Sequence, residues 1–132
     1  MRGVLSCLLL LLVLSACNLT ATEPTPFPTP DLPQVTFNTP PNGATVLEGV
    51  LMDVDLVASD TTAGINRIEF YVDGSMLEDG SPDSGSEELF RVTMNWLAEG
   101  VGLHSLSAIA YRPDGIPSQE TTIVIEVLPN TN

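Results

Sequence analysis

The sequence predicts an all-β domain built as a two-layer sandwich. Three observations predict it: apolar and polar residues alternate with a period of two, turns rich in Gly and Pro separate these segments, and residues 35–128 nowhere keep the 3.6-residue period of an amphipathic helix. Such alternation gives each strand one buried and one solvent-facing side. Apolar burial alone must hold the core, because both cysteines, Cys7 and Cys17, precede the domain.

Seven strands follow from the pattern. Residues 50–59 alternate most clearly, and Asp73-Gly74 supplies a two-residue hairpin turn between the third and fourth strands. Strands that recur about every ten residues are typical of an immunoglobulin-like sandwich. The predicted strands cover, in order, residues 35–38, 50–59, 67–72, 75–78, 90–96, 104–110 and 123–127.

Residues 1–16 are predicted to be a signal peptide. Arg2 is followed by an apolar run, residues 4–14, that is shorter than the about 20 residues needed to span a bilayer. The segment ends in Leu-Ser-Ala-Cys, which resembles the lipobox of bacterial lipoproteins. This resemblance implies that Cys17 becomes the first mature residue and carries acyl chains such as palmitate that enter the lipid bilayer. The alternative is an ordinary secretory signal cut near Ala16.

Residues 17–34 are expected to form the lipidated cysteine and a disordered linker rich in Thr and Pro. Prolines at positions 24, 26, 28, 30 and 33 favour an extended polyproline conformation, which would reach roughly 50 Å at about 3.1 Å per residue. Residues 129–132 form a short tail. Asn18 differs from the Asp that retains lipoproteins in an inner membrane, so we expect display outside the cytoplasm on the cell membrane or the outer membrane.

Charge and missing motifs restrict the function. Acidic residues number 17 against four basic ones, so the chain would repel nucleic-acid phosphates and anionic headgroups. The sequence has no nucleophile-elbow, zincin, P-loop or dinucleotide motif, and we therefore predict no enzyme activity, no catalytic residue and no cofactor. The only histidine, His104, shares the inward parity of Leu106, so we expect it to border the core and to hydrogen-bond a neighbouring loop.

The polar segment 79–88 carries oxygen ligands at alternating positions, like a calcium loop. It fails the EF-hand pattern, because Ser84 stands where glycine is required and Phe90 where a bidentate glutamate is required. A solvated loop is favoured over a metal site. Calorimetric titration of calcium would decide between the two.

Three stretches resemble the bacterial Ig-like domains of secreted hydrolases and surface proteins. They read PPNGATV at residues 40–46, GINRIEFYVDG at 64–74 and GLHSLSAIAY at 102–111, and Trp96 belongs with them. The chain departs from the family at Arg112, where an acidic residue is usual. The resemblance covers nearly all of the domain and implies its fold more strongly than any activity.

Two surface features are candidates for interaction. Arg67, Tyr71, Ile109 and Tyr111 share the outward parity of two strands that pair in this fold, and such a face is suited to contact a protein or to stack a sugar. Asp53 and Asp55 share the polar face of one strand, with Arg91 as the expected ion-pair partner.

Together these patterns predict a membrane-anchored binding or spacer module that contacts a cell-envelope protein or polysaccharide. The alternative is an accessory subunit that docks on an envelope transport or hydrolase complex. A sugar-binding module is the third hypothesis. The sequence fixes neither the partner nor the oligomeric state.

Overall fold

The computed structural model describes residues 26, 29 and 31–131, and in these residues it contains eight β-strands and no helix. The domain is therefore all-β, as predicted, but with one strand more than the seven expected. The strands are β1 (Gln34–Thr39), β2 (Thr45–Leu47), β3 (Leu51–Ser59), β4 (Arg67–Val72), β5 (Ser75–Gly80), β6 (Leu89–Leu97), β7 (Gly102–Tyr111) and β8 (Thr121–Leu128).

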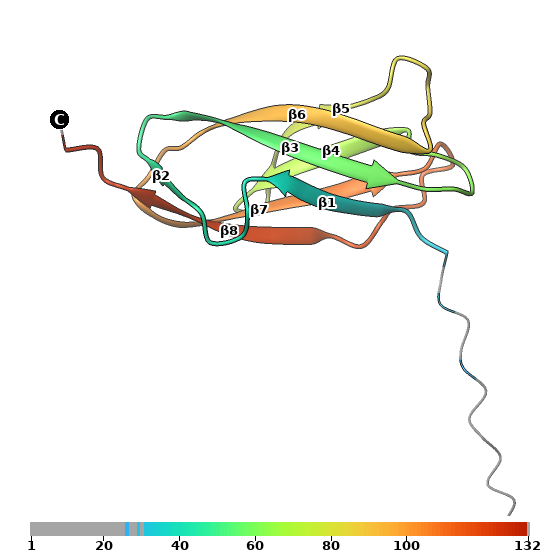
Figure 1. The fold of residues 1–132 in the computed structure, drawn as a ribbon, viewed down its shortest axis with the longest axis horizontal. Coiled ribbons are helices and arrows are strands. Elements are labelled where there is room, and N and C mark those ends of the chain that lie inside the picture. Colours follow the sequence, from blue (N-terminus) through green and yellow to red (C-terminus); the bar gives the residue numbers. More distant parts are fainter. Residues whose placement is uncertain (1–25, 27–28, 30, 132) are drawn as a thin grey trace, which may run out of the picture.

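The strands form two sheets packed face to face (Figure 1). One sheet has the order β1-β3-β6 and the other the order β2-β8-β7-β4-β5. β1 begins at one end of the long axis of the sandwich and β8 ends at the opposite end (Figure 1). We call these the β1-entry end and the far end. The immunoglobulin-like sandwich predicted from strand spacing is confirmed.

The hydrophobic core lies between the sheets and follows the alternation of the sequence. Val54, Leu56 and Ala58 of β3 are buried while their neighbours along the strand are more exposed. Leu106, Ala108 and Ala110 of β7 meet them from the other sheet, as the parity of that segment predicts, and each is fully buried. Complete burial of one large aliphatic or aromatic side chain contributes about 1.5–3 kcal/mol, so apolar contact accounts for the cohesion of the two layers.

The additional strand, β2, is three residues long and pairs in parallel with the end of β8. The turn before it is held to the same strand, because Gly43 N donates to the carbonyl of Val124 and Asn42 Oδ1 accepts from Val124 N. Gly43 has a φ of +82°, which suits glycine. The pattern of residues 45–47 alone is too short to indicate a strand, since its pairing depends on β8.

The hairpin between β4 and β5 forms as predicted. Asp73 and Gly74 both have positive φ, at 49° and 80°, as a two-residue hairpin turn requires, and Val72 pairs with Ser75 across it. β5 extends to Gly80, beyond the predicted end at residue 78. This lengthens the edge of the five-stranded sheet beside β6.

Candidate functional site

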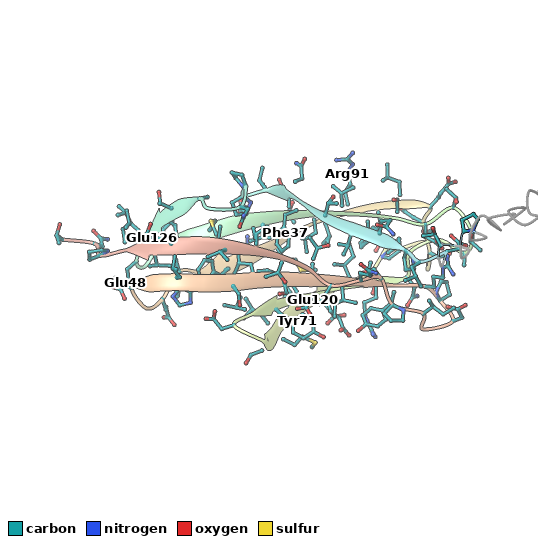
Figure 2. The ribbon with its side chains drawn as sticks, turned by 90° about the horizontal axis from the view of Figure 1, so that it is seen from below. Phe37, Glu48, Tyr71, Arg91, Glu120 and Glu126 are labelled. Atoms are coloured by element: carbon teal, nitrogen blue, oxygen red, sulfur yellow. The ribbon has the colours of Figure 1, made fainter. Side chains whose placement is uncertain are left out.

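The sequence-predicted contact residues lie together on the outer face of the five-stranded sheet. The register of β4 and β7 places Arg67 beside Tyr111 and Glu69 beside Ile109. Tyr71 follows beside Ser107, the next pair on the same face. Figure 2 shows Tyr71 on the side of the sandwich opposite to Arg91. We call this set, Arg67, Glu69, Tyr71, Ile109 and Tyr111, the tyrosine face.

Glu69 organises the tyrosine face. Its carboxylate accepts a hydrogen bond from the Tyr71 hydroxyl at 2.6 Å and pairs with Arg67 Nη2 at 2.9 Å. The Arg67 guanidinium carbon lies 4.6 Å from the centroid of the Tyr111 ring, within cation–π range. The two tyrosines are half-buried instead of exposed. The face is therefore prearranged, with one hydroxyl already committed to a carboxylate.

The carboxylate also changes the acidity of the tyrosines. The hydrogen bond to Glu69, together with burial, raises the pKa of Tyr71 to about 12. Burial, followed by the proximity of Glu69, raises the pKa of Tyr111. Both phenols are protonated at neutral pH, and the Tyr71 hydroxyl donates to Glu69. Alternation along the strand places Glu69 on the outward face but does not predict its role, because that role depends on which residues β7 places beside it.

His104 occupies the predicted position at the border of the core. Its Nδ1 lies 2.7 Å from Asp73 Oδ2, and its Nε2 lies 2.6 Å from the carbonyl oxygen of Gly100. The expectation that it would hydrogen-bond a neighbouring loop is confirmed. A carboxylate and a carbonyl both accept, so His104 makes both bonds as donor only when both ring nitrogens carry a proton. The hydrogen bond to Asp73 accordingly raises the pKa of His104, with that to Gly100 next in effect.

Trp96 and His104 form the base of a surface hollow of about 490 Å³ between β5 and β6. Their rings are tilted by 56° with centroids 5.5 Å apart. Trp96 is buried, while three leucines at the margin of the hollow are among the more exposed apolar residues of the domain. The hollow is lined by Leu51, Val72, Asp73, Leu77, Asn95, Trp96, Leu97, Glu99 and His104. No pattern in the sequence brings these residues together, because they come from five separate segments.

The ion pair predicted for Arg91 is wrong. β3 and β6 pair so that Asp55 faces Thr93 and Asp53 faces Asn95, which leaves Arg91 opposite Val57. Asp55 accepts from the hydroxyls of Thr93 and Thr39, and Asp53 accepts from the Asn95 amide. Parity placed the three charged residues on the correct face, but the ion pair required a register shifted by two residues.

A buried ion pair joins the two sheets at the β1-entry end. Asp60 follows β3 and Arg112 follows β7, and their side chains form two hydrogen bonds of 2.9 and 2.7 Å. Arg112 Nη2 also lies 3.1 Å from Asp31, just before β1. The Arg112 hydrogen bonds outweigh burial and lower the pKa of Asp60 to about 2, while Asp60 raises the pKa of Arg112. The departure from the family pattern at position 112 is therefore a structural link.

The remaining predicted features are partly outside the described residues. Cys17, the signal segment and most of the Thr/Pro-rich linker lie outside them. In the part that is described, Pro33 is fully buried and β1 begins at Gln34. Over residues 26, 29 and 31–131, no three His, Cys, Asp or Glu side chains are grouped to hold a metal ion, and no helix is long and apolar enough to cross a membrane.

The fold and surface define an immunoglobulin-like β-sandwich module. Comparison with known families identifies which one: the chain belongs to the bacterial Ig domain family, whose pattern it matches over residues 33–108. The resemblance of the domain to bacterial Ig-like domains is thereby confirmed. Comparison with curated proteins gave no match.

Solved structures agree on the fold. The chain is similar to the fibronectin(III)-like modules of Clostridium thermocellum CbhA, with 24% identity, a TM-score of 0.62, and coverage of 73% of this chain and 98% of that one. A CARDB domain from Pyrococcus furiosus, solved with di-metal ions, gives 14% identity and a TM-score of 0.57 over 78% of this chain and 100% of that one. The SrpA adhesin of Streptococcus sanguinis gives 16% identity and a TM-score of 0.54, over 76% of this chain and 59% of that one.

Proposed function

We propose that this protein is an exported, lipid-anchored Ig-like module that acts by binding or spacing outside the cytoplasmic membrane, without catalysis. The single observation that carries the proposal is the geometry of chain entry. Asp31 and Pro33 contact the sandwich at the β1-entry end, so a stalk before residue 31 meets the domain there (Figure 1). The far end then points away from the bilayer. The adhesin among the structural neighbours is consistent with a role in surface contact.

The anchor is tested with the two cysteines of the signal region. Cells expressing the full chain are fed an alkyne-labelled palmitate, and the protein is followed in membrane and aqueous fractions. We expect wild type and the matched control Cys7→Ser to carry the label in the membrane fraction, because only the lipobox cysteine is acylated. Cys17→Ser should lose the label and the membrane association. Label retained on Cys17→Ser would overturn Cys17 as the attachment site, and wild type without label would overturn the lipid anchor.

Surface display is tested separately. A protease added to intact cells should degrade the domain if it is displayed outside, and leave it intact if it faces an interior compartment.

Crosslinking in the same cells distinguishes a spacer from a subunit of a complex. A spacer gives no dominant adduct, whereas a subunit of an envelope transport or hydrolase complex gives one adduct of constant mass.

The tyrosine face is proposed as one contact surface for protein or polysaccharide. Its support is the cluster of two rings, a guanidinium and Ile109 held together by Glu69 on the outer sheet face. Retention of purified protein on envelope polysaccharide should fall when both Tyr71 and Tyr111 are replaced by alanine. Unchanged retention of this double variant would remove the tyrosine face from the proposal.

A further inference from the structure

The hollow between β5 and β6 presents more apolar surface than a free module needs. Leu51, Leu77 and Leu97 come from three different strands and are 62%, 50% and 45% exposed. We call the site that they surround the leucine hollow. Scattered exposed leucines are ordinary, but three around one concave site are a feature that a partner can cover.

The base of the leucine hollow is held in place before any partner binds. Trp96 is 5% exposed and packs against the His104 ring, which is fixed on both nitrogens by Asp73 and the Gly100 carbonyl. Asp73 is fixed in turn by the Ser105 amide at 2.9 Å. A base of this kind loses little conformational freedom on binding, which favours affinity for a matching side chain.

The charge around the leucine hollow is negative. Asp73 and Glu99 line it, Glu78 accepts from the backbone of Asn95 at 3.3 Å, and Asp53 accepts from the Asn95 side chain. The one basic group in the hollow, His104, is paired with Asp73.

The described arginines are far from this rim. Arg67 begins β4, Arg112 follows the end of β7, and Arg91 pairs with Val57 near the end of β3, all in the half of the sandwich toward the β1-entry end. The leucine hollow is thus an apolar site surrounded by carboxylates, with no described arginine at its rim.

We infer that the leucine hollow is a docking site for a partner protein segment that inserts an aliphatic side chain and flanks it with Lys or Arg. A second copy of this chain fits poorly, because two carboxylate rims would face each other across the contact. Anionic headgroups fit poorly for the same reason. Complementary charge and an exposed apolar centre are the composition expected of a small protein interface. This inference rests on the proposed binding role but does not depend on the lipid anchor.

Trp96 is the only tryptophan of the chain, so fluorescence excited at its absorption edge reports directly on the hollow. The full chain, kept in a zwitterionic detergent whether or not it carries a lipid, is titrated with the synthetic peptide Lys-Leu-Lys-Leu-Lys. We expect a saturable change in Trp96 emission, and weakening by fivefold or more when salt rises from about 20 to 200 mM. Lys-Ser-Lys-Ser-Lys should bind at least tenfold more weakly, and Glu-Leu-Glu-Leu-Glu should not bind.

The variants compare leucines inside the leucine hollow with one outside it. Leu97→Ser on β6 and Leu77→Ser on β5 should each weaken binding of the leucine peptide by fivefold or more. Leu89→Ser should change binding less than twofold, because Leu89 is 53% exposed, no less than Leu97, but lies at the other end of β6. Equal binding of the serine and leucine peptides to wild type would overturn the apolar role, whatever the variants do.

Two further results would also overturn the inference. One is an equal loss of binding in Leu89→Ser and Leu97→Ser. The other is a dimer, seen by sedimentation, that Leu97→Ser dissociates while the leucine peptide does not change Trp96 emission. That result would assign the site to a second copy of the chain. None of these outcomes bears on palmitate labelling at Cys17, so the inference and the proposed function fail separately.

Discussion

Glu69 determines the chemical state of the tyrosine face. Its carboxylate accepts from Tyr71 at 2.6 Å, and loss of the phenolic proton would place two negative groups side by side. Replacing Glu69 with glutamine removes the charge and keeps the shape. We expect the pKa of Tyr71 to fall from about 12 toward the ordinary value of about 10. Absorbance of the phenolate near 295 nm, followed against pH, measures the change.

The matched control for this titration is Glu126→Gln, an exposed carboxylate on the far half of the same sheet. It should leave both tyrosine titrations unchanged. If Glu69→Gln and Glu126→Gln give the same curves, the hydrogen bond to Glu69 does not control Tyr71.

His104 should couple stability to pH in the neutral range. Its pKa is raised, chiefly by Asp73, so the folded state binds the proton more tightly than the unfolded chain. The stabilisation is complete below the unfolded pKa of about 6.5 and is lost as pH rises through the folded pKa. We expect about 1 kcal/mol, a modest value because Asp73 is half exposed and solvent screens the pair.

The measurement compares wild type with His104→Gln by thermal unfolding at pH values from 5 to 9. The difference in Tm should be largest at low pH within this range and shrink as pH rises, since other groups cancel in the comparison. Asp73→Asn should reduce the same pH dependence. A constant difference across the range would show that His104 contributes packing but no proton linkage.

At the level of elements, Gly80 of β5 lies closely against β6. A Cβ built there would lie 2.9 Å from Val92 Cγ2 and 3.3 Å from Met94 Cε. Valine is stiff about χ1 and cannot yield easily, so the strand pair must separate to admit a methyl group. We expect Gly80→Ala to lower the free energy of unfolding by about 1–2 kcal/mol. Urea denaturation monitored by circular dichroism gives this quantity.

Ser81→Ala is the control for Gly80→Ala, because Ser81 is the next residue and is exposed. It should change stability by less than about 0.5 kcal/mol. An alanine at position 80 that leaves the domain as stable as wild type would mean that β5 is free to move away from β6. The leucine hollow, which lies between these strands, would then lack a fixed width.

The alternation of residues predicted the elements better than it predicted their partners. Parity identified seven of the eight strands and the border position of His104, because period-two burial can be recognised from the residues of each strand alone. It missed β2, whose three residues become a strand only beside β8. It also misassigned Arg91, since parity fixes the face but not the register, and Asp55 lies opposite Thr93.

The sites depended even more on long-range contacts. The tyrosine face was found because Arg67 and Tyr111 lie on adjacent strands with matching parity. The leucine hollow was not found, because Leu51, Leu77 and Leu97 meet only across two sheets. Such a site has no local signal, and only the sandwich geometry reveals it.

At the scale of the whole molecule, the buried pair between Asp60 and Arg112 holds the two sheets together at the β1-entry end. Asp31 shares the same guanidinium but has a side chain that is 67% exposed, against 2% for Asp60. A single arginine therefore has a buried carboxylate partner held by two hydrogen bonds and an exposed one held by a single longer bond. Replacing each with asparagine compares a buried with an exposed ion pair in one domain.

We expect Asp60→Asn to lower Tm by roughly 10 °C, because it leaves the Arg112 charge buried and poorly compensated. Asp31→Asn should lower Tm by no more than about 2 °C.

The same pair should make stability depend on pH in the acidic range. The pKa of Asp60 is depressed to about 2, so its contribution to the free energy of unfolding is present above the ordinary pKa near 3.8 and is lost as pH falls through about 2. Wild type and Asp31→Asn should therefore lose stability steeply over that acidic interval, and Asp60→Asn should lose less. Thermal unfolding between pH 2 and 5 measures both effects, and equal losses in the two variants would mean that burial does not decide what this arginine contributes.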